Sequence, residues 1–136
     1  MQGYSDNIRS QGEFVVNMVP EEVAETLNTT APSRVDEAQL AGLGVAESVS
    51  VAVPRIKLSP VALECDLFQM ISPGRTSTIR LGPLVHMHIR TAVFIDLQRL
   101  YINPAELRLI GRMHRAGGYT TTRDLFHIER KVWPVE

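Results

Sequence analysis

The chain has 136 residues, of which 44% are hydrophobic, and its formal net charge is −1. This length predicts one domain, residues 1–136. Arginines scattered among acidic residues exclude the basic patch that nucleic acids or anionic membranes would require. No apolar run reaches the roughly 18 residues that span a bilayer, and the polar start does not resemble a signal peptide, so we expect a cytoplasmic protein without a membrane partner.

Cys65 is the single cysteine, which excludes an intrachain disulfide. It could be a nucleophile or a small core residue. Its place in the alternating pattern of a predicted strand favours the core.

The N-terminal elements combine short helices with one strand. Residues 4–11 predict a short first helix, and the β-branched residues in 14–19 predict a strand buried on both faces or nearly so. A proline followed by two glutamates predicts a helix over 20–28. Residues 35–43 predict a second short helix that glycine ends, and 45–58 predict one or two short edge strands.

The next segment predicts an antiparallel hairpin around which the rest of the chain packs. Polar and apolar side chains alternate in 61–67 and again in 78–90, which is typical of strands with one apolar and one polar face. The turn at 72–75 contains proline and glycine. Pro83 cannot donate a ladder hydrogen bond, so we expect an edge position or a bulge there. We place Glu64 on the polar face.

The C-terminal part predicts smaller elements. Residues 93–100 fit a strand or a loop, whereas Asn103 predicts the N-cap of a helix that ends near Ile110. The basic, glycine-containing run 111–118 predicts a loop over a site or an interface. Residues 119–128 predict a last strand, and 131–136 a tail.

His86 and His88 lie two residues apart on the polar face of the predicted strand. A metal ion would need a third and a fourth ligand, and the other histidines, His114 and His127, lie on different elements. We therefore expect no metal site and interpret the pair as half-exposed side chains on a sheet face.

Nearly the whole chain resembles the flavin reductase-like, FMN-binding split-barrel family. The resemblance rests on many short runs in the family's order and spacing. These include NIR at 7–9, GEFVVN at 12–17, EEVA at 21–24, NTT at 28–30, VDE at 35–37, LAGL at 40–43, SPVALEC at 59–65, GPLVHMHI at 82–89, INPAEL at 102–107, IGRM at 110–113 and YTTTRDLF at 119–126. Pro83 departs from the family, in which an acidic residue is expected.

The resemblance implies a mainly β fold, an antiparallel split barrel with small helices. Family members carry further strands before the region that matches, so the barrel is expected to be truncated at its N-terminus. The resemblance also implies a homodimer with FMN at its interface. Strands that lack neighbours expose backbone edges that a partner must cover, which separately predicts an oligomer. The implied activity is hydride transfer from NAD(P)H to flavin, with an oxygenase as a possible partner that receives reduced flavin.

The resemblance also implies cofactor-binding residues. Asn28 and Thr29 would border the flavin, although capping and turn formation also explain them. A histidine of the His86 and His88 pair would lie on the nicotinamide side of the flavin as a hydrogen-bond donor.

Two residues nearer the C-terminus have similar alternatives. Arg112, or Arg115, would grip a phosphate of FMN or of the nicotinamide nucleotide, but a cation after a helix end is also favourable for the helix dipole. Tyr119 would stack on the isoalloxazine or serve as a barrel aromatic. No catalytic acid or base is expected, because flavin itself performs hydride transfer. A flavin carrier and a non-catalytic dimerising module remain the alternative functions.

Overall fold

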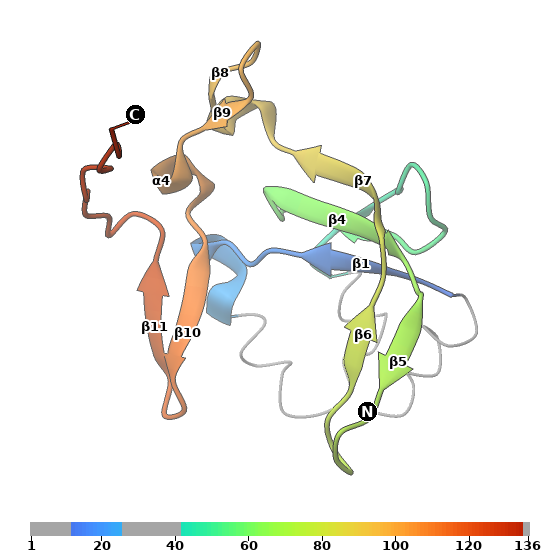
Figure 1. Ribbon diagram of the computed structural model, residues 1–136. Coiled ribbons are helices and arrows are strands. Elements are labelled where there is room, and N and C mark those ends of the chain that lie inside the picture. Colours follow the sequence, from blue (N-terminus) through green and yellow to red (C-terminus); the bar gives the residue numbers. More distant parts are fainter. Residues whose placement is uncertain (1–11, 26–41, 135–136) are drawn as a thin grey trace.

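The computed structural model describes residues 12–25 and 42–134, and most of its elements are short β-strands (Figure 1). The predicted helix at 4–11 lies outside the described residues, as does the helix predicted at 35–43 except for a turn at 42–43. The elements in chain order are β1 (Glu13–Asn17), the 3-10 helix η1 (Glu21–Val23), β2 (Val45–Ala46), β3 (Arg55–Ile56), β4 (Val61–Asp66), β5 (Gln69–Ile71), β6 (Ile79–Leu81), β7 (Leu84–Ile89), the 3-10 helix η2 (Thr91–Val93), β8 (Phe94–Asp96), β9 (Tyr101–Ile102), α4 (Pro104–Leu107), β10 (Ile110–His114) and β11 (Gly118–Thr121).

A three-stranded antiparallel sheet in the order β1-β4-β7 forms the centre of the fold (Figure 1). The alternation in 61–67 and 78–90 predicts this pairing of β4 with β7, and the prediction is confirmed. The connection between them is itself a hairpin, because β5 pairs with β6. In-register residues share a face, so Glu64 lies between Val15 and His86 on one side of the sheet.

Pro83 lies at the junction of β6 and β7, where the strand pairing is interrupted. The register shifts between Glu64 and Cys65, and the backbone N–H of Asp66 donates to the carbonyl of Pro83 over 3.1 Å. Because β7 is also an edge strand of the sheet, proline costs no ladder bond there. The predicted edge position and bulge are both confirmed.

A small cluster of buried apolar side chains lies on the Glu64 side of the sheet. Val51 and Val53, in the segment that joins β2 to β3, pack against Val15 and Ala62. The pairing of β2 with β3 confirms the short strands predicted in 45–58. Cys65 is buried, and burial, with a smaller effect of the Asp66 carboxylate, raises the pKa of its thiol, so the prediction of a core cysteine is confirmed.

The opposite face of the central sheet exposes apolar side chains. Val16 is 42% exposed and Met87, in the same cross-strand row, is 46% exposed. The prediction that the strand at 14–19 is buried on both faces or nearly so is therefore wrong for β1. The segment that joins β2 to β3 packs on the Glu64 face, and on the second face Val61 and Cys65 of β4 are buried whereas Val16 and Met87 are exposed.

Helical structure is short in the described chain. The helix predicted over 20–28 begins as η1 and continues through Glu25, and its last residues lie outside the described part. The side chain of Asn103 caps α4 by accepting from Ala105 N–H over 3.2 Å, as predicted. The helix ends at Leu107 rather than near Ile110, because Arg108 adopts a left-handed conformation with φ 49°. No helix in residues 12–25 or 42–134 is long and apolar enough to cross a membrane.

The C-terminal region is a projecting hairpin. β10 and β11 pair antiparallel, and their turn lies away from the central sheet (Figure 1). The loop predicted at 111–118 is therefore wrong, since most of it is strand and tight turn. The strand predicted over 119–128 ends at Thr121, and residues 125–134 have no regular structure, which agrees with the predicted tail over its described part. Residues 93–100 resolve into β8 followed by a turn.

Candidate functional site

The polar face of the central sheet is covered at its centre, at Glu64. The alternating pattern predicts that Glu64 faces outward, but its side chain has no exposed surface. The segment that joins β2 to β3 covers this face and is held by side-chain acceptors of the sheet. Asn17 accepts the N–H of Ile56 over 2.9 Å, and Glu13 accepts the N–H of Ala52 over 3.1 Å. The expectation that Glu64 faces outward is thus wrong, whereas His86 and His88 are half-exposed, as predicted.

Glu64 is the strongest of these anchors. Its carboxylate accepts backbone N–H groups from Val49, Ser50 and Val51 over 2.6 to 3.1 Å, and it also contacts Nε2 of His88. Burial alone would raise the pKa of this carboxyl, but the backbone N–H groups and His88 outweigh it and lower the pKa to about 2. Glu64 therefore carries a negative charge at neutral pH inside the protein.

His86 and His88 lie side by side on β7, next to Glu64. Their ring centroids are 4.6 Å apart, and the rings meet at 64° in an edge-to-face arrangement. Glu64 is the cross-strand partner of His86 and touches His88. The structure therefore brings the two predicted histidines together with a carboxylate that the sequence analysis did not connect with them.

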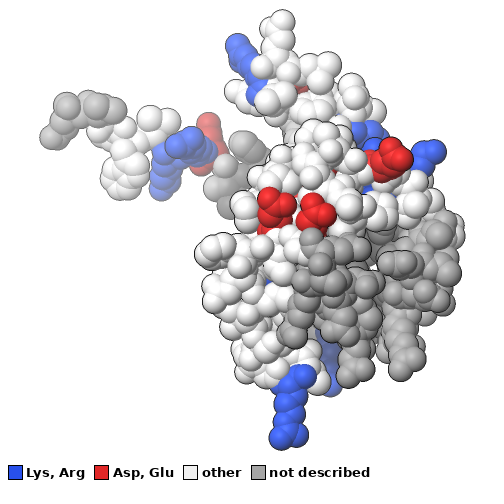
Figure 2. Space-filling view, turned by 90° about the vertical axis from the view of Figure 1, so that its right-hand side faces the viewer, with Lys and Arg blue, Asp and Glu red and all other residues white. Residues whose placement is uncertain are grey.

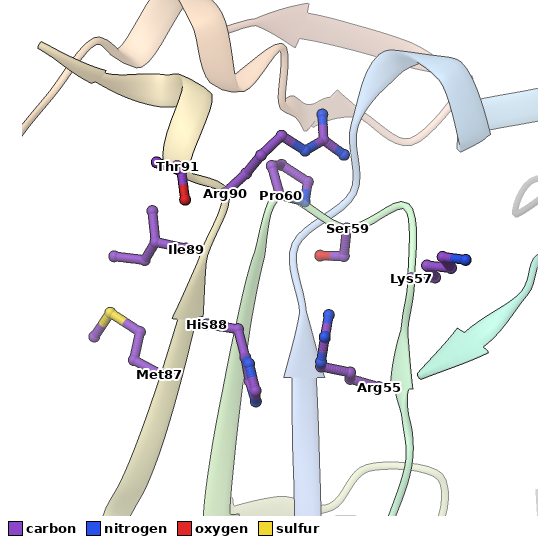
Figure 3. Close-up of a pocket in the computed structure, with 9 residues that line it drawn as sticks. All are labelled: Arg55, Lys57, Ser59, Pro60, Met87, His88, Ile89, Arg90 and Thr91. Carbon is purple, nitrogen blue, oxygen red and sulfur yellow. The ribbon is translucent and has the colours of Figure 1, made fainter. Parts of the chain in front are cut away.

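A cavity of about 400 Å³ opens beside His88. The residues that line it are Arg55, Lys57, Ser59, Pro60, Met87, His88, Ile89, Arg90 and Thr91 (Figure 3). Figure 3 shows Arg55 and His88 directed towards the space between the strands, whereas Met87 and Ile89 leave β7 on the other side. Of the described residues that line the cavity, three carry a positive charge and none is acidic.

Arg55 is the key cation of this cavity. Its Nε atom is buried and has no hydrogen-bond partner among the described residues. A buried guanidinium N–H without an acceptor is uncommon, and a bound anion or water usually explains it. Arg90, by contrast, is already engaged, because its Nη2 donates to the carbonyl of Leu58 over 3.0 Å and lies 4.0 Å from Glu22.

The positive charge that lines the cavity is not part of a larger basic patch on the face that Figure 2 shows. On the face shown in Figure 2, lysine and arginine side chains are scattered, and most of the described surface is uncharged. Arg55, Lys57 and Arg90 all line the cavity, so it suits one small anionic group, such as a phosphate, which the Arg55 guanidinium can bind.

A model of the flavin reductase-like domain matches residues 2–104. The chain belongs to this flavin reductase-like family. An uncharacterized protein of Deinococcus radiodurans is 39% identical over 130 residues, which cover 93% of this chain and 57% of the relative. The chain therefore spans somewhat more than half of that relative's length.

Solved structures place the chain in the same fold. The 2-nitrobenzoate 2-nitroreductase NbaA of Pseudomonas fluorescens superposes with a TM-score of 0.84 at 27% identity, over 99% of this chain and 68% of that one. Component B of the nitrilotriacetate monooxygenase from Bacillus cereus has a TM-score of 0.77 at 26% identity, over 92% and 64% of the two chains. A split-barrel structure from Shewanella frigidimarina, with a TM-score of 0.76 at 16% identity over 96% and 66%, supports the fold alone. The fold is an antiparallel split barrel, as predicted.

Among the other predicted site residues, Arg112 and Tyr119 do not line the His88 cavity. Asn28 and Thr29 lie outside the described residues. Arg112 lies on β10, not after a helix end as predicted, and pairs in register with Tyr119 on β11. Within one chain, these two residues belong to the projecting hairpin, whereas His86 and His88 belong to the central sheet (Figure 1).

Sequence reasoning missed Arg55, Lys57 and Glu64 as site residues. The signal for Glu64 was present, because the alternation in 61–67 places it on the face that also carries His86 and His88 once the register of β4 and β7 is known. Arg55 and Lys57 gave no such signal. Their position depends on the fold of the segment after β2, which brings them beside the end of β7.

Proposed function

We propose that this chain is an FMN-binding, flavin reductase-like protein that transfers hydride from NAD(P)H to flavin. The observation that carries the proposal is the cationic cavity beside His88, in which Arg55 has a buried, unpartnered Nε, in a chain of the flavin reductase-like family. The nitroreductase and monooxygenase-component neighbours support a flavin-related oxidoreductase class.

The residues of the cavity fit the phosphate of FMN. Arg55 would donate its free N–H to a phosphate oxygen, and Lys57 would add a positive charge. Ser59 would keep a structural role, because its hydroxyl is engaged with the carbonyls of Met18 and Val61 over 2.7 Å each. The cavity would thus hold the anionic end of the cofactor and leave the ring system outside it.

The bound flavin would supply the hydride chemistry, and the protein would position it. His88 is held by buried Glu64, so its ring is fixed at the edge of the cavity, where it would be a hydrogen-bonding partner of the ligand. His86, packed against His88, would support that orientation. We keep Asn28, Thr29, Arg112 and Tyr119 as further proposed contacts with flavin or nicotinamide nucleotide.

We also propose that the protein acts as a homodimer. The β10–β11 hairpin projects from the body of the chain, and Tyr119 on it is 47% exposed (Figure 1). Within one chain Arg112 and Tyr119 belong to a different sheet from His88, so a second copy would be needed to bring them to a flavin. The exposed apolar face of the central sheet, with Val16 and Met87, also supports association.

Anaerobic mixing with NADH or NADPH tests the proposed activity. The purified protein, loaded with FMN, is expected to be yellow and to lose its absorbance near 450 nm at a rate that rises with protein concentration. Yellow protein that does not bleach would make the chain a flavin carrier, and protein that binds no flavin would leave a non-catalytic dimerising module. An oxygenase that accepts reduced flavin and a cytoplasmic location remain parts of the proposal.

A further inference from the structure

Glu64, His86 and His88 form a compact cluster of metal-ligand side chains. One potential ligand atom of each lies within 4.8 Å of the other two. The cluster follows from strand geometry, because His86 and His88 are two residues apart on one face of β7 and Glu64 is the in-register neighbour of His86 on β4. It is also protected, since Glu64 is fully buried and the side chain of His88 is only 19% exposed.

The chemistry of the cluster suits a divalent transition-metal ion. Two imidazole nitrogens and one carboxylate oxygen are ligands that Zn²⁺, Co²⁺ and Fe²⁺ accept, and three protein ligands leave at least one coordination position free. Glu64 is negatively charged inside the protein, and both imidazole rings lie beside it. A dication would satisfy all three groups together.

The surroundings of Glu64 resemble the support that metal ligands usually have. The backbone N–H groups of Val49, Ser50 and Val51 donate to the carboxylate and fix its orientation. Its Oε1 accepts all three of them, whereas Oε2 accepts one, from Val49, and faces Nε2 of His88. Oε2 is therefore the oxygen available to an ion.

We infer that Glu64, His86 and His88 bind a divalent transition-metal ion of the Zn²⁺ class. The ion takes the place of the hydrogen bond between His88 and Glu64. Oε2 of Glu64 and one nitrogen of each histidine are the ligands, and a water molecule or an anion takes the free position. The ligands are in place in the chain alone, so metal binding can be tested without flavin, although His88 also lines the cavity proposed for FMN.

The test is metal uptake by the full, EDTA-stripped and flavin-free chain. Zn²⁺ binding is measured by calorimetry, and Co²⁺ binding by visible absorption, in the wild type and in His86→Ala. His86 is chosen for substitution because it is only half-buried, so the variant is expected to fold. His127→Ala, at an exposed histidine outside the strands, is the matched control.

The wild type and His127→Ala are expected to bind about one Zn²⁺ per chain with the same affinity. His86→Ala should weaken binding about tenfold or more and abolish the Co²⁺ absorption bands. Wild-type protein that takes up no more metal than His86→Ala would overturn the inference, as would loss of binding in His127→Ala. A Glu64→Gln variant that retains its far-UV circular dichroism should behave like His86→Ala, and full metal binding by it would also contradict the site.

Discussion

The backbone N–H of Ser50 donates to Oε1 of Glu64 over 2.6 Å, which ties the covering segment to the middle strand of the central sheet. The residues on either side of Ser50 donate to the same carboxylate. The Glu64 side chain on β4 thus accepts hydrogen bonds from three consecutive backbone N–H groups. These groups lie between β2 and β3 and belong to no strand. The covering segment, which carries the core residue Val51, depends on this carboxylate for its position.

Replacing Glu64 by alanine should therefore destabilise the protein strongly. The variant removes the buried acceptor and leaves several backbone N–H groups and His88 without their partner, so the free energy of unfolding should fall by about 3 kcal/mol or more. Urea denaturation followed by circular dichroism measures the change. Glu47→Ala, at an exposed position of the same segment, is the control and should differ from the wild type by less than about 0.5 kcal/mol. Equal stability of the two variants would contradict the anchoring role.

The stability of the protein should also depend on pH through Glu64. Its folded-state pKa of about 2 is below the ordinary glutamate value of 4.5, so the folded state favours the ionised form. The stabilisation is fully present above about pH 4.5 and is lost as the pH falls from there towards 2. Urea titrations in EDTA between pH 6 and 3 should show the wild type losing stability faster than Glu64→Gln. Parallel curves for the two proteins would exclude Glu64 as the titrating group.

Gly82 marks a close approach between the β6–β7 junction and β4. A Cβ atom at this position would lie 1.9 Å from the carbonyl oxygen of Asp66 and 2.8 Å from Cε1 of Phe14. Gly82→Ala must displace backbone, so it should cost about 1–3 kcal/mol of unfolding free energy. Gly74→Ala is the matched control, because nothing lies within 4 Å of its added Cβ, and it should leave the melting temperature unchanged or slightly higher. A Gly82→Ala variant with the unfolding free energy of the wild type would contradict this prediction, because the backbone beside Pro83 would then shift at no cost.

Much of the fold follows from local patterns in the sequence. The alternation in β4 and β7 predicts their pairing, Pro83 predicts the bulge, and Asn103 predicts the cap of α4. Each signal is contained in a few neighbouring residues. The β10–β11 hairpin escaped prediction because its glycines and basic residues are equally typical of a loop, and its pairing becomes visible only in the folded chain.

The candidate site was predictable only in part. His86 and His88 stand out from the alternation, but whether their face is open depends on a distant segment. The hydrogen bonds of Val49, Ser50 and Val51 to Glu64 link residues 13 to 15 positions apart, and the pattern of either stretch alone gives no sign of them. Arg55 likewise becomes a site residue only through its position beside β7.

The central claim is that the cavity beside His88 holds the phosphate of FMN, and a comparison of FMN with riboflavin tests it most directly. Riboflavin lacks the phosphate, so its affinity reports the remaining contacts. Fluorescence titrations should use the wild type, Arg55→Met and Arg75→Met, the last at an exposed arginine in the tip of the β5–β6 hairpin. We predict that the wild type and Arg75→Met bind FMN about tenfold or more tightly than riboflavin, and that Arg55→Met binds both alike. Equal affinities of the wild type for FMN and riboflavin would contradict the account.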